Sequence, residues 1–149
     1  MPDHVICNTS CLIALSSIES LGLLIQLYDT IIVPKGVVEE FGEIDLQNAK
    51  IMSVESSMAR LLSEQLNLGK GEAEAIALAG SLKKALILDD RKARKVAKEL
   101  DLKVTGTIGI LLKAEEKGII KSAYDKIMDL KSKGFYISDE IINQAKNRT

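Results

Sequence analysis

The hydrophobic positions of the chain fall into short unbroken runs separated by longer stretches of periodic spacing. Residues 85–88 form the clearest run, which is typical of a strand in a parallel sheet covered on both faces. Residues 30–33 form a second, rich in β-branched side chains. Polar residues, glycine or proline follow the runs and end them. The predicted strands are residues 4–7, 30–33, 51–54, 85–88 and 103–105.

Between these runs, apolar residues recur at the spacing of one helical face. Pro34 is predicted to open a helix, because proline fits a first helical turn, and Gly42 to end it. Gly69 and Gly71 are expected to separate two helices. The predicted helices are residues 11–17, 21–28, 36–41, 58–66, 72–82, 92–100 and 108–117, and two segments of residues 121–147 separated by residues 134–137.

Strands that alternate with helices predict an α/β fold in which helices cover both faces of a parallel sheet. The expected architecture is a three-layer α/β/α sandwich with a short central parallel sheet. The 149 residues, 46% of them hydrophobic, fit a single domain spanning residues 1–149. In such a fold, sites form at the carboxyl ends of the strands.

Composition narrows the function classes. No apolar run approaches the ~20 residues that span a bilayer, and residues 1–4 lack signal-peptide features, so a cytoplasmic protein without membrane contact is expected. Cys7 and Cys11 have no matching ligands elsewhere and are expected to be buried, inert thiols. A net charge of −1 and 3% aromatic residues argue against a polyanion binder that stacks bases on an aromatic platform.

Polar residues follow three of the predicted strands and begin the helices beside them. Converging carboxylates of this kind suit Mg²⁺ or Mn²⁺, which activate water and stabilise phosphoryl transfer. The strand-end residues are Asn8-Thr9-Ser10, Asp89-Asp90 and Thr105-Gly106-Thr107, and the helical acids are Glu39, Glu40, Glu72 and Glu74.

Each of these positions also has a structural explanation. Asn8, Ser10, Asp89, Asp90 and Thr107 are residue types that cap helices, and glutamates commonly lie on solvated helix faces. Of the adjacent Asp89 and Asp90, only one is expected to cap. No nucleophile-elbow, phosphate-loop or dinucleotide-binding motif occurs in the chain.

Five segments, taken in order, resemble the PIN-domain proteins, and more narrowly an uncharacterised prokaryotic subfamily related to the VapC toxins. The first is Val5 to Ser10 followed by residues 12–15, and the second is residues 32–34 with residues 37–41. The others are residues 71–79, 86–94 and 106–111. The resemblance covers about residues 4 to 140 and implies the same α/β/α sandwich.

The resemblance implies a metal-dependent endoribonuclease that uses Mg²⁺ or Mn²⁺. The implied catalytic and metal-binding residues are Asp90, Glu40, Glu72 and Asn8, with Asp89 as a further metal ligand and Glu74 as the alternative register to Glu72. RNA contacts are expected at Arg91, Lys92, Ser10 and Thr107, whereas Lys95 and Lys98 are expected to be solvated.

Asn8 departs from the family pattern, which commonly has Asp as a central metal ligand there. Removing one carboxylate near a divalent ion costs on the order of several kcal/mol. A catalytically degenerate module that binds protein or RNA is therefore the alternative. The resemblance also raises a toxin inhibited by a small antitoxin, and a homodimer. Residues 12–15 and 21–27 are candidates for the dimer interface, although the hydrophobic core is the more common use of such amphipathic helices.

Overall fold

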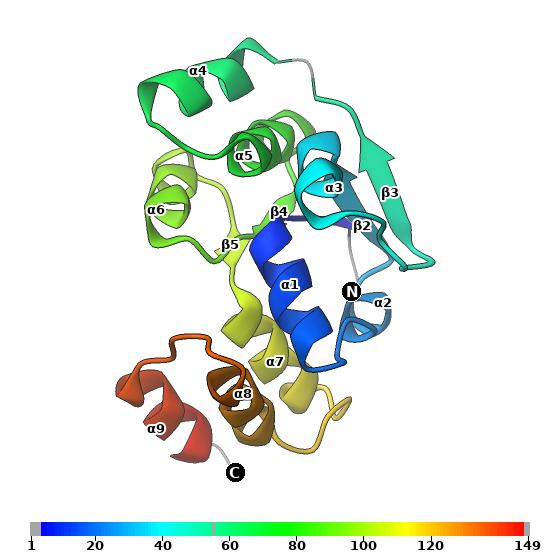
Figure 1. Ribbon diagram of the computed structural model, residues 1–149, viewed down its shortest axis with the longest axis vertical. Helices are drawn as coiled ribbons and strands as arrows, with labels where there is room; N and C mark the ends of the chain where they lie inside the picture. Colours follow the sequence, from blue (N-terminus) through cyan, green and yellow to red (C-terminus); the bar gives the residue numbers. More distant parts are fainter. Residues whose placement is uncertain (1–3, 55, 148–149) are drawn as a thin grey trace.

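Five short parallel strands form the centre of the molecule in a computed structural model that describes residues 4–54 and 56–147 (Figure 1). The strands are β1 (His4–Cys7), β2 (Thr30–Pro34), β3 (Ala49–Met52), β4 (Ala85–Ile87) and β5 (Val104–Thr105). They pair in the order β3-β2-β1-β4-β5, and every pairing is parallel. The predicted short parallel sheet is confirmed.

Helices cover both faces of this sheet, which confirms the three-layer α/β/α architecture (Figure 1). Helices α4, α5 and α6 pack on one face, and α1, α2, α7, α8 and α9 build the core on the other. The bounds are α1 (Thr9–Ser17), α2 (Leu23–Leu27), α3 (Lys35–Phe41), α4 (Ser57–Gln65), α5 (Lys70–Leu82), α6 (Arg91–Glu99), α7 (Thr107–Glu116), α8 (Ala123–Ser132) and α9 (Asp139–Asn147).

Neighbouring residues of the central strands point to opposite faces and enter different cores. In β1, Val5 and Cys7 pack in the core of α1 and α7, whereas Ile6 packs against α5. In β4, Ile87 packs in the same core as Val5 and Cys7, and Leu86 packs in the same core as Ile6. All five side chains are fully buried. Both faces need apolar residues, and this explains why the strand segments read as unbroken apolar runs.

Four predicted boundaries differ from those of the structure. Pro34 is the last residue of β2, where it pairs with Met52, and it has extended dihedral angles at the N-cap of α3. The predicted strand at residues 51–54 comes too late, since β3 is an edge strand whose side chains are only partly buried or exposed. Its hydrophobic pattern is therefore weak. Gly71 lies inside α5 rather than before it, and Thr9 is the first residue of α1 rather than part of the segment before it.

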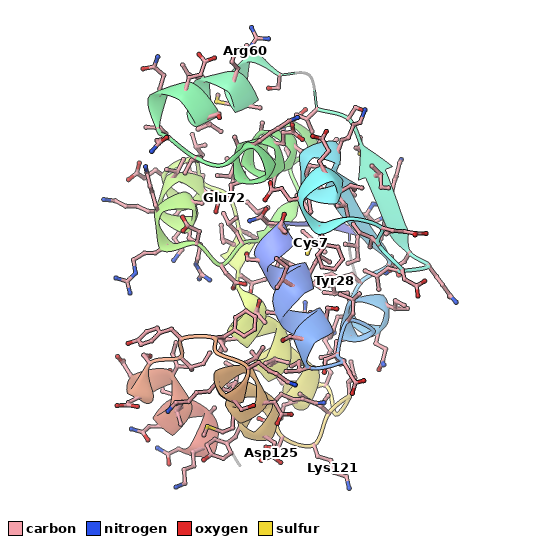
Figure 2. All side chains as sticks on the ribbon, in the orientation of Figure 1. Cys7, Tyr28, Arg60, Glu72, Lys121 and Asp125 are labelled. Carbon is pink, nitrogen blue, oxygen red and sulfur yellow. The ribbon has the colours of Figure 1, made fainter. Side chains whose placement is uncertain are left out.

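The two cysteines are free and fully buried, as predicted. A hydrogen bond with Cys11 and burial raise the pKa of the Cys7 thiol well above its usual range. The reactive thiolate is thus suppressed at neutral pH. Cys7 is labelled in Figure 2, near the start of α1. Residues 1–3, part of the segment expected to lack a signal peptide, lie outside the described residues. No helix in the described ranges could cross a bilayer.

Candidate functional site

The candidate site lies at the middle of the sheet, between the adjacent strands β1 and β4, where the chain leaves the two strands toward opposite edges of the sheet. From β1 the chain continues to β2 and β3 on one side, and from β4 to β5 on the other. Asn8 follows β1 and Asp89-Asp90 follow β4, so both lie at this point of divergence, where α/β proteins place their ligand sites. The Asn8 N–H donates to the Ile87 carbonyl at 3.1 Å and holds the two strand ends together.

Asn8 occupies the N-cap position of α1, but its side chain caps nothing. The residue is 97% buried, with a relative exposure of 3%. Beside it, the hydroxyl oxygens of Thr9 and Ser10 are buried without a hydrogen-bond partner in the described part of the chain. Capping therefore does not explain the polar triplet. Two adjacent buried hydroxyls without a partner among the described residues are the kind of group that a bound ligand or water satisfies.

Glu40 and Glu74 join α3 and α5 by reciprocal hydrogen bonds. Glu74 of α5 accepts the N–H of Gly36, at the start of α3, at 2.9 Å. Glu40 of α3 accepts the N–H of Gly71, at the start of α5, at 3.1 Å. Both partners are glycines because a Cβ at either position would collide with the facing carboxylate. Each helix thus receives a carboxylate at its positive end from the other helix.

These hydrogen bonds distinguish between Glu72 and Glu74, the two candidates for the third acidic residue of the site. Glu74 is buried and turned toward the start of α3, which gives it a structural use. Glu72 is half-buried and lies between α5 and α6 in the view of Figure 2. Of the two, Glu72 is the side chain that faces the other candidate acids.

Three predicted acids, Glu72, Asp90 and Glu40, lie close enough for their charges to interact. Burial is the main cause that raises the pKa of Glu72, and the nearby charges of Asp90 and Glu40 raise it further. The Gly69 N–H, 3.2 Å from Glu72 Oε1, and the Lys92 ammonium act in the opposite direction. We call Glu40, Glu72 and Asp90 the acidic centre. Like charges are held together there without a compensating cation of equal weight.

Asp89 and Asp90 contact different helices, and only Asp90 is an N-cap, as expected. Asp90 Oδ2 accepts the Ala93 N–H of α6 at 2.9 Å. Asp89 accepts from the Thr107 N–H at 2.7 Å and from the Thr107 hydroxyl at 2.5 Å, at the start of α7. Gly106, not Thr107, is the N-cap of α7. Because both oxygens of Asp89 are engaged, Asp90 is the better candidate ligand.

The chemistry of the acidic centre suits a hard divalent cation, but its carboxylates are not drawn tightly together. In Glu40, Glu72 and Asp90, one oxygen accepts a backbone N–H and the other has no hydrogen-bond partner among the described residues. These free oxygens and the Asn8 amide are the ligand types that Mg²⁺ and Mn²⁺ prefer. However, no three His, Cys, Asp or Glu side chains within residues 4–54 and 56–147 already form a metal-binding cluster.

The predicted RNA contacts divide between two places. Lys92 acts electrostatically on Glu72, whereas Arg91, Ser10 and Thr107 line a cavity of about 980 Å³ next to the acidic centre. Lys95 and Lys98, expected to be solvated, are exposed and also line this cavity.

Arg94 was missed as a site residue in the sequence. Its guanidinium donates to the Leu88 carbonyl at 3.4 Å, and it flanks Gly106 together with Asp89. The signal that could have found it is the three-residue spacing from Arg91, which places both side chains on one face of α6.

Comparison with known proteins gives one family. A family model described as DUF3368, PIN domain, matches residues 4–149 of the chain. The match extends from β1 through α9 and includes Asn8 and the whole acidic centre. No curated protein matches the chain.

Proposed function

Since the chain belongs to the PIN-domain family, whose fold is of the nuclease type, we propose that it is an endoribonuclease dependent on Mg²⁺ or Mn²⁺. The observation that carries the proposal is the acidic centre at the sheet's point of divergence. Glu72 is held there in a partly buried position despite the charges of Asp90 and Glu40. A fold with no use for a cation gains nothing from this repulsion.

Four residues are proposed to hold the metal: Glu40, Glu72, Asp90 and Asn8. A bound divalent ion lowers the pKa of its water and neutralises charge on a phosphodiester. The carboxylate oxygens without a hydrogen-bond partner would bind the metal. The other oxygen of each carboxylate accepts a backbone N–H at the start of a helix and so orients the side chain. The starts of α1, α6 and α7 lie at the same edge of the sheet and favour an anionic phosphate. Lys92 and Arg91 are proposed to bind the RNA backbone.

Asn8 sets the expected strength of metal binding. Its amide oxygen coordinates hard cations but brings no charge, so the centre relies on three carboxylates. We therefore expect weak affinity, in the range where millimolar metal is needed. The buried hydroxyls of Thr9 and Ser10, which lack hydrogen-bond partners among the described residues, would add polar groups to the site beside Asn8.

The test is a calorimetric titration with Mn²⁺, run beside an RNA cleavage assay. Wild-type protein is expected to bind Mn²⁺, and Asp90→Asn to lose both binding and cleavage by at least about 100-fold. The fold should remain, because Asn caps α6 as well as Asp does. Asp125→Asn, an exposed acid at the far end of the molecule in Figure 2, is the matched control and should behave as wild type.

The second candidate is a PIN-like binding module without catalysis. Two observations favour it: Asn8 in place of the usual acid, and carboxylates that do not cluster tightly within the described ranges. Absence of Mn²⁺ binding by the wild type at millimolar metal would select this candidate. A toxin role with a small antitoxin, and a homodimer, are further proposals that rest on the family resemblance.

A further inference from the structure

A large cavity lies beside the acidic centre and is distinct from it. Its volume is about 980 Å³, and it is lined mainly by α6, the β5–α7 connection and the segment between α8 and α9. Figure 1 shows that segment on the same side of the molecule as α6. Asp89 and Arg91 line the cavity, but Asn8, Glu40, Glu72 and Asp90 do not. The cavity is therefore a neighbouring compartment that shares its border with the acidic centre.

One wall of the cavity carries positive charge that the fold leaves uncompensated. Arg91, Arg94, Lys95 and Lys98 of α6 all line it. Arg94 donates to the Leu88 carbonyl and lies near Asp89. Arg91, Lys95 and Lys98 have no ion-pair partner among the described residues. Of the two acids on the lining, Asp89 is already engaged by Thr107. Four cations, three of them without an ion-pair partner among the described residues, outnumber the two acids Asp89 and Glu99 and favour an anionic occupant.

The opposite wall is apolar and presents one aromatic ring to solvent. Leu130 and Phe135 pack in the core, and the Phe135 N–H donates to the Leu130 carbonyl at 3.1 Å. The next residue, Tyr136, is 90% exposed although it lies between the partly buried Phe135 and Ile137. Its ring thus contributes little to folding and borders the cavity. Exposed aromatic rings beside cations are the elements that bind unpaired bases.

The lining of the cavity also includes polar residues. Ser10 lines it, and the Ser10 hydroxyl is buried with no hydrogen-bond partner in the described residues. Thr105 and Gly106 line it as well, next to the start of α7. The lining therefore combines polar residues, a cationic wall and an apolar wall.

We propose that this cavity binds unpaired nucleotides of single-stranded RNA next to the phosphate held at the acidic centre. The α6 cations bind the backbone, and Tyr136 stacks on a base. A concave site admits a base only when it is unstacked and unpaired, so a duplex cannot fill it. The inference rests on the proposed function for its orientation toward the acidic centre. The low aromatic content does not oppose it, because one correctly placed ring is enough.

Binding is measured by fluorescence anisotropy with a labelled single-stranded RNA of about eight nucleotides, in EDTA, so that cleavage plays no part. Tyr136→Ala is expected to weaken binding by about 10-fold and Tyr136→Phe by less than about 2-fold, because phenylalanine keeps the stacking face. Lys95→Ala combined with Lys98→Ala should reduce the slope of log affinity against log salt by about 1 to 2. Lys121→Ala, at the far end of the molecule in Figure 2, is the matched control.

The outcomes separate the cavity from the nuclease. RNA binding that depends on Tyr136 with no cleavage in Mn²⁺ supports the cavity and overturns the proposed function. Metal-dependent cleavage that is unaffected by Tyr136→Ala and by loss of the two lysines overturns the cavity alone. Equal affinity for a hairpin duplex overturns the preference for single strands. Tighter, Tyr136-dependent binding of an acidic peptide than of RNA would assign the cavity to a protein and overturn the proposal.

Discussion

The acids at the carboxyl edge of the sheet and the cations of α6 lie side by side but are held in different ways. Every acid accepts a backbone N–H at the start of a helix: Glu74 at α3, Glu40 and Glu72 at α5, Asp90 at α6 and Asp89 at α7. The cations at Arg91, Lys95 and Lys98 have no ion-pair partner in the described part of the chain. The acids therefore stabilise the fold in addition to any role in binding a cation. The three cations form no ion pair of the fold, and their charges remain available to bind a ligand.

Glu74→Ala should give the largest effect on the structural side of this comparison. The substitution leaves the buried Gly36 N–H without its acceptor, so the free energy of unfolding is expected to fall by about 2–3 kcal/mol. Glu74→Gln keeps the oxygen and should lose less. Urea denaturation measures both. A loss below about 0.5 kcal/mol in Glu74→Ala would mean that the reciprocal bonds between α3 and α5 do not stabilise the fold.

Asp90→Ala should give an intermediate effect and sharpen the distinction between capping and chemistry. Alanine removes the cap of α6 and is expected to lower the free energy of unfolding by about 1 kcal/mol, whereas Asp90→Asn leaves it within about 0.5 kcal/mol. Both variants should lose metal binding. Thermal unfolding compares them directly. Equal stability of the Ala and Asn variants would show that Asp90 has no structural role.

Glu72→Gln should give the smallest effect, and one of opposite sign. The raised pKa means that the folded state disfavours the charged carboxylate, so the penalty is present at neutral pH and disappears as pH falls toward about 4, the ordinary pKa of Glu. Glutamine keeps the bond to the Gly69 N–H and removes the charge. We expect a gain of about 0.5 kcal/mol at pH 7, modest because solvent screens the half-exposed group.

The measurement for Glu72→Gln is the difference in melting temperature from wild type between pH 4 and pH 7. The difference should grow with pH. Lys95→Ala, expected to leave stability within about 0.5 kcal/mol at either pH, is the control from the cationic side. A glutamine variant that is less stable than wild type at pH 7 would contradict the repulsion within the acidic centre.

Sequence pattern predicted the central strands well because both of their faces are buried. Leu86 and Ile87 enter different cores, and only an unbroken apolar run satisfies both. The edge strand β3 was misplaced because its residues are partly exposed and carry little pattern. The prediction of β3 thus failed because its burial is weak.

The candidate site was predictable only as a set of residue types at strand ends. The bond from Gly36 to Glu74 spans 38 positions, and the one from Gly71 to Glu40 spans 31, so no local pattern contains either. Likewise, Asp89 reaches Thr107 across 18 positions. Tyr136 could not be linked to α6 from sequence, since the two meet only through the packing of α8 and α9.

The paired glycine amides offer a built-in reporter of what happens at the acidic centre. Gly71 and Gly36 each donate to a glutamate of the other helix, but only the acceptor of Gly71 belongs to that centre. If a cation bound at the free oxygen of Glu40 immobilises that side chain, hydrogen–deuterium exchange at the Gly71 amide slows while that of Gly36 keeps its rate. The ratio of the two exchange rates then follows occupancy residue by residue, in a protein that need not turn over any substrate.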